Sequence, residues 1–105
     1  MSRKRPQDTD WLKYVRQLGK NIEETREAKH LSQIEVANAA DLSRYTYQKL
    51  ESGIGSKPTG AKGTTPSNPS LRNVMAVAQA LGVTLADLLP DMCDEGTKPP
   101  DLSAR

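Results

Sequence analysis

The apolar positions near the start of the chain recur at helical intervals. They fall at i, i+4, i+7 and i+11, which places them on one face of a helix, and they are Trp11, Val15, Leu18 and Ile22. Thr9 or Asp10 can cap the first turn with a side-chain oxygen. The pattern predicts an amphipathic helix that ends at about Lys29.

A capping box marks the start of a second helix. Ser32 is followed three residues later by Glu35, so each side chain can bond to the backbone N–H of the other residue. This signal predicts a helix over Gln33 to Ala39, which Ala40 to Leu42 interrupts as a short turn.

A third helix follows the turn at once. Ser43 can cap it, it is predicted over Arg44 to about Ser52, and Gly53 can end it in the left-handed conformation that glycine adopts without strain. The next segment, 54–69, contains three glycines and three prolines, which disfavour any regular element. We expect an exposed loop there, without regular hydrogen bonding.

Helical spacing returns after this loop. The apolar positions of a fourth helix are Leu71, Val74, Val77, Ala78 and Leu81. Ser70 can cap this helix and Gly82 can stop it. Thr84 and Asp87 form a second box ahead of a short fifth helix, which Pro90 ends.

These elements predict an all-α fold, because no stretch shows the alternation of apolar and polar residues typical of a strand. We expect a compact bundle of about five helices over residues 9–90, with a long loop, 54–69, between the third and fourth helices. Residues 1–8 are predicted to form a flexible basic arm and residues 91–105 a flexible tail.

The second and third helices have the pattern of a helix-turn-helix. Such a unit needs an apolar inner face, a small residue where the helices cross and a turn residue that tolerates positive φ. Ala37 is the small residue and Asp41 occupies the turn. The inner face is predicted to contain Val36, Ala40, Leu42, Tyr47 and Leu50.

Polar residues occupy the opposite face of the third helix. Arg44 and Gln48 lie four positions apart, as do Tyr45 and Lys49, so all four face away from the predicted core. A polar helix face of this kind can reach base edges in a DNA groove, although a solvated helix face is the simpler explanation for exposed charge.

The distribution of charge supports a polyanionic partner. Residues 1–69 carry twelve Lys/Arg against eight Asp/Glu, a net charge of +4, whereas the remainder carries three against five, a net charge of −2. Lys57 and Lys62 in the loop can contact a DNA backbone or simply keep the loop soluble.

Other functions lack a sequence signal. His30 and Cys93 are the only histidine and cysteine, and no nucleophile motif or glycine-rich phosphate loop accompanies them, so we expect no enzyme, no cofactor and no metal site. No apolar run is long enough to cross a bilayer or to act as a secretory signal. These features predict a cytoplasmic protein that does not associate with membranes.

Several strings resemble the Cro and phage-repressor family of helix-turn-helix proteins, also called xenobiotic-response-element-like. They are Leu31-Ser32-Gln33, Glu35-Val36-Ala37, Leu42-Ser43-Arg44, Leu50-Glu51-Ser52-Gly53 and Pro69-Ser70-Leu71, followed by Ala78, Ala80-Leu81-Gly82-Val83 and Leu88-Leu89. The resemblance implies a lambda-repressor-like fold. It also implies that Gln33 contacts a DNA phosphate. The residues that would contact bases or the DNA backbone are Arg44, Tyr45, Gln48 and Lys49. The resemblance further implies that the protein binds paired half-sites as a homodimer.

Three features depart from the family pattern. Asp41 stands where the family usually has glycine, and Tyr47 stands where it usually has Ile or Val, so the Tyr47 hydroxyl needs a polar partner or a place at the edge of the core. The loop 54–69 is longer than is common in the family.

Two hypotheses for the function follow. The first is a sequence-specific regulator that binds a double-stranded DNA operator, represses by occupying it, and uses Ser43 together with the four outward residues of the third helix. The second is a protein-interaction module, such as an antitoxin-like or polymerase-binding adaptor. Candidate residues for a dimer interface are Trp11, Leu12, Leu88, Leu89 and Met92.

Overall fold

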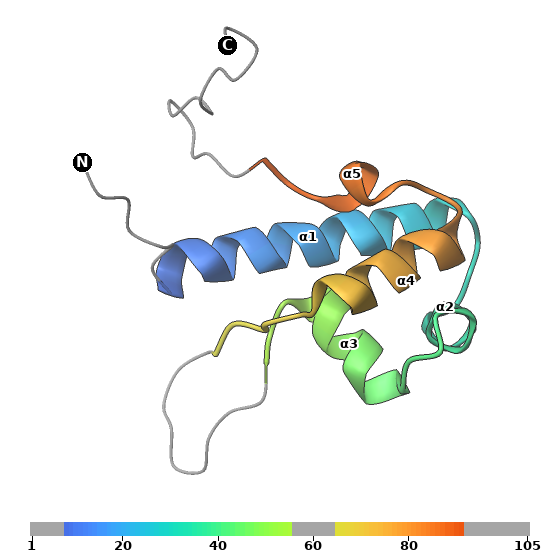
Figure 1. Cartoon of the computed structure of the whole chain (residues 1–105), viewed down its shortest axis with the longest axis horizontal. Coiled ribbons are helices and arrows are strands. Elements are labelled where there is room, and N and C mark those ends of the chain that lie inside the picture. The colour runs from blue at the N-terminus through green and yellow to red at the C-terminus, as the bar shows by residue number, and fades with distance from the viewer. Residues whose placement is uncertain (1–7, 56–64, 92–105) are drawn as a thin grey trace, which may run out of the picture.

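The computed structural model describes residues 8–55 and 65–91, and every regular element in these two segments is a helix apart from one isolated bridge. The helices are α1 (Asp8–Ala28), α2 (Gln33–Ala39), α3 (Arg44–Ser52), α4 (Leu71–Leu81) and α5 (Leu85–Leu88). Figure 1 shows α1 as the long helix along which the others are arranged, with α3 and α5 on different sides of it. The predicted all-α five-helix fold is therefore confirmed.

Local capping signals determine where most helices begin. The N-caps of α2, α3, α4 and α5 all have extended backbone and accept a hydrogen bond from the third helical N–H; they are Ser32, Ser43, Ser70 and Thr84. Both predicted capping boxes are present. The predicted bounds of α2 and α3 are confirmed. Helix α1 begins at Asp8, two or three residues earlier than the predicted caps indicated, and ends at Ala28, one residue before the predicted end.

Three predicted turn residues adopt left-handed backbone conformations. Gly53 ends α3 with φ 75°, and Gly82 ends α4 with φ 73°. Asp41 has φ 58° in the turn between α2 and α3, as expected for the residue that replaces the family's glycine. The turn therefore keeps its geometry without glycine.

The hydrophobic core lies where α1, α2, α3, α4 and α5 meet. Its fully buried members come from every helix, and the largest are Tyr47, Ile22, Leu81, Leu88, Val15, Val36 and Val77. Ala37, the small residue predicted for the helix crossing, is buried in this core. Among the described helices, none is long and apolar enough to cross a membrane.

The base of the 54–69 segment is packed and hydrogen-bonded, which corrects the expectation of a loop without regular structure. Ile54 and Pro66 form an antiparallel bridge, and the Ser67 N–H donates to the Gly53 carbonyl at 3.0 Å. The Trp11 indole N–H donates to the Ser67 carbonyl at 2.8 Å, and Ser67 is buried. The sequence missed these contacts because they join residues far apart in the chain. Lys57 and Lys62 lie outside the described residues.

Candidate nucleic-acid interface

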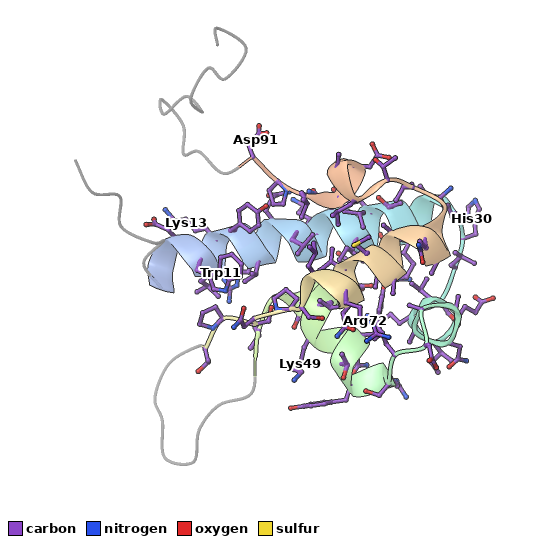
Figure 2. The ribbon with its side chains drawn as sticks, in the orientation of Figure 1. Trp11, Lys13, His30, Lys49, Arg72 and Asp91 are labelled. Atoms are coloured by element: carbon purple, nitrogen blue, oxygen red, sulfur yellow. The ribbon has the colours of Figure 1, made fainter. Side chains whose placement is uncertain are left out.

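The two faces of α3 have different environments. Tyr47, Leu50 and Glu51 are buried against the core, whereas Arg44 and Tyr45 are exposed. Gln48 and Lys49 are half-buried, and the Lys49 side chain projects away from α1 (Figure 2). The structure thus presents the four predicted contact residues together along one side of α3.

The aromatic ring of Tyr45 contacts Lys49, which is one of the two cationic residues on this side of α3; the other is Arg44. The Lys49 ammonium lies 4.7 Å from the centroid of the Tyr45 ring, a distance within the range of a cation–π interaction. Tyr45 is 60% exposed, so the pair stands at the surface. The interaction holds the Lys49 charge beside a flat apolar surface before any ligand arrives.

Ser43 acts as the N-cap of α3. Its hydroxyl accepts a hydrogen bond from the Thr46 backbone N–H at 3.1 Å and donates to the Thr46 hydroxyl at 2.9 Å. The structure therefore places the predicted contact residue Ser43 at the start of α3, with its hydroxyl engaged within the chain. A direct DNA contact by Ser43 stays a prediction.

Gln33 stands at the first position of α2, beside α3. Its side-chain nitrogen donates to Glu51 Oε1 at 2.8 Å, and the residue is half-buried. The contact ties the start of α2 to the end of α3. The predicted phosphate contact of Gln33 is not tested by this geometry, but the amide is held in a defined place.

A buried ion pair lies behind Gln33. Arg26 of α1 donates to both carboxylate oxygens of Glu51, from Nε at 2.9 Å and from Nη2 at 3.0 Å, and its Nη1 donates to the Leu31 carbonyl at 2.8 Å. The Tyr47 hydroxyl donates to Glu51 Oε2 at 2.5 Å. Tyr47 has therefore found the polar partner that its burial requires.

The protonation equilibria of these groups reflect the network. Burial raises the pKa of the Glu51 carboxyl, but hydrogen bonds from Arg26, Tyr47 and Gln33 outweigh burial, so its pKa lies below the ordinary value. Burial, followed by the hydrogen bond to Glu51, raises the pKa of Tyr47. Glu51 is therefore ionised and Tyr47 protonated near neutral pH.

Comparison with known proteins agrees with this geometry. A family model described as helix-turn-helix matches residues 22–63. The structure is similar to that of the restriction-modification controller protein C.AhdI from Aeromonas hydrophila, with 28% sequence identity and a TM-score of 0.58 over 71% of this chain and 96% of that protein. The matched residues include α2 and α3, so this part of the chain is similar to known helix-turn-helix units. No curated protein matches the chain.

These two similarities support the coarse function predicted from the sequence, which is a DNA-binding transcription regulator. Within this helix-turn-helix protein, sequence reasoning overlooked Arg26 and Glu51. Both positions carried a signal, because Arg26 continues the spacing of Leu18 and Ile22, and Glu51 lies four residues after Tyr47. A charged residue on an otherwise apolar helix face indicates a buried partner.

Proposed function

We propose that the protein is a sequence-specific repressor that binds a double-stranded DNA operator through the outward side of α3. The observation that supports the proposal most directly is the division of α3. Tyr47, Leu50 and Glu51 fix one face in the core, and the other face presents polar side chains to solvent. Occupation of the operator by the helix-turn-helix itself is the proposed mode of repression.

The outward residues differ in the contacts that they can make. Arg44 offers parallel N–H donors that match the two acceptors of guanine, and the amide of Gln48 matches adenine. Lys49 supplies a point charge for a phosphate, and its contact with Tyr45 limits where that charge can be. We therefore assign base recognition to Arg44. We also propose that the protein is cytoplasmic and has no enzymatic activity.

We further propose that the protein binds as a homodimer, because one recognition helix makes few contacts and a two-fold site doubles them. Leu88 cannot contribute to the interface as the sequence suggested, because it is fully buried in the chain's own core. Leu89 is exposed, whereas Met92 lies outside the described residues.

If the duplexes selected from a random pool are palindromic, the centres of their two half-sites should lie about 10 to 10.5 base pairs apart. A monomeric complex on an asymmetric site would contradict the dimer.

Replacing Arg44 with alanine should separate base recognition from general attraction to DNA. We expect Arg44→Ala to lose roughly 1–3 kcal/mol of binding free energy at the preferred duplex and to relax discrimination at one position of each half-site. The measurement is the affinity for the selected duplex and for its single-base variants, with circular dichroism as the check on folding.

Arg16→Ala is the matched control, because Arg16 is an exposed arginine on α1 and its loss changes the net charge equally. We expect this control to keep the pattern of discrimination among the single-base variants. Unchanged discrimination in Arg44→Ala would remove Arg44 from base recognition.

The second candidate function is a protein-interaction module, and one surface feature favours it. Leu71 and Met75 lie four positions apart on α4 and are 63% and 45% exposed. Exposed apolar neighbours can form part of a protein interface. This candidate predicts that the chain shows no salt-dependent binding to duplex DNA.

A further inference from the structure

The contact between Gln33 and Glu51 fixes which end of the Gln33 amide faces inward. A carboxylate can only accept hydrogen bonds, so the Gln33 nitrogen must point to Glu51 Oε1, as it does at 2.8 Å. One of the two hydrogens on this nitrogen is then engaged. Because Gln33 is only half-buried, the second hydrogen remains available to a group at the surface.

The Glu51 carboxylate is a buried and multiply hydrogen-bonded anchor for this amide. Its side chain is 3% exposed, and Arg26 and Tyr47 donate three hydrogen bonds to its two oxygens from α1 and α3. Arg26 is held in turn by the Leu31 carbonyl. The Gln33 nitrogen is therefore attached to a buried carboxylate that α1 and α3 both hold by hydrogen bonds, although Gln33 itself begins a short helix.

The charge of the anchor is also compensated. An isolated carboxylate behind Gln33 would repel a DNA phosphate, but the Arg26 guanidinium pairs with it at 2.9 Å, so the pair is neutral overall. A phosphate can approach the surface side of the Gln33 amide without meeting a net negative charge.

We propose that Glu51 is a positioning residue for DNA binding, which holds the Gln33 nitrogen so that its second hydrogen is donated to a backbone phosphate. The inference rests on the proposed function and deepens it. Glutamine suits this place because both partners are acceptors and a primary amide nitrogen offers one hydrogen to each. Glu51 itself does not touch the DNA.

A double-mutant cycle on the selected duplex tests this role, because residues that act as one unit have non-additive effects. We expect Gln33→Ala to weaken binding about tenfold, as for loss of a hydrogen bond to a charged group. Glu51→Gln should weaken binding about three- to tenfold when Gln33 is present, and less than about twofold when residue 33 is alanine. Equal effects of Glu51→Gln in both backgrounds would overturn the proposal.

Gly82→Ala is the matched control for stability. It strains the backbone at the end of α4, where Gly82 has a φ of 73°, and it removes no hydrogen bond to Glu51 or Gln33. We expect Gly82→Ala to lower the melting temperature and to change the affinity for the duplex less than about twofold. A loss of affinity that follows the loss of stability in every variant would show that Glu51 acts only on the fold.

The side-chain amide signals of Gln33 give a second test in the unmodified protein, which remains decisive if Glu51→Gln does not fold. In the free chain, the two amide protons should differ widely in chemical shift, because one already bonds to Glu51. Adding the duplex should shift the other proton. If neither proton responds to a duplex that binds, the proposal fails; if the wild-type chain binds no duplex, the proposed function fails with it.

Discussion

Replacing Gly19 with alanine is expected to destabilise the protein by roughly 2–4 kcal/mol, even though alanine is the better helix former by about 1 kcal/mol. A Cβ atom at this position of α1 would lie 2.2 Å from the Glu51 carbonyl oxygen and 2.8 Å from the Leu50 carbonyl oxygen. These are backbone atoms at the end of α3, so the helices themselves would have to move apart. Urea unfolding of the wild type and Gly19→Ala measures the difference.

Two other glycines provide controls for this prediction. A Cβ atom at Gly82 would have no neighbour within 4 Å, so Gly82→Ala should lose only the stability that a non-glycine residue loses at a φ of 73°, about 1 kcal/mol. Gly53→Ala combines a φ of 75° with a Cβ 2.8 Å from the Arg16 Cα, and it should lose at least as much stability as Gly19→Ala. If Gly19→Ala is no less stable than Gly82→Ala, α1 and α3 are not packed as closely as the structure shows.

Replacing Arg26 with methionine is expected to lower the free energy of unfolding by about 3–5 kcal/mol, because it leaves the buried Glu51 carboxylate without its counter-charge. Chemical denaturation of the variant measures this loss. The double variant Arg26→Met Glu51→Met should lose less, because no charge then remains buried. A double variant that is less stable than Arg26→Met alone would mean that the unpaired Glu51 charge is not what destabilises Arg26→Met.

The same ion pair makes stability depend on pH. The pKa of Glu51 in the folded chain lies below its ordinary value of 4.5, so its contribution to stability is present above pH 4.5 and is lost as the pH falls through the folded value. The wild type should therefore lose stability in acid more steeply than Glu51→Gln. Glu35 and Asp87, whose pKa values are also lowered, are present in both proteins and cancel in the comparison.

The sequence predicted those features of the fold that depend on neighbouring residues. A capping side chain bonds to a backbone N–H only three positions away, so Ser32 and Ser43 were sufficient to locate α2 and α3. The outward positions of α3 followed from helical periodicity alone. The start of α1 was misplaced by two or three residues, because its predicted caps, Thr9 and Asp10, lie inside the helix.

Contacts between residues that are far apart in the chain could not be predicted from the sequence. Trp11 and Ser67 are 56 positions apart and Arg26 and Glu51 are 25 apart, and no local pattern links either pair. The position of Gln33 at the start of α2 was predictable, but the direction of its amide was not, because Glu51 determines it across the turn. The candidate site was therefore predictable as a list of residues and not as a geometry.

The most direct test of the account is the binding of the wild-type chain to duplexes selected from a random pool, measured at two salt concentrations. We predict that one sequence is enriched and that its affinity falls as salt rises, with log K declining by about 0.9 per log unit of salt for each phosphate contacted by a cation. A pool that shows no enrichment, together with binding that does not depend on salt, would contradict operator binding and favour the protein-interaction function.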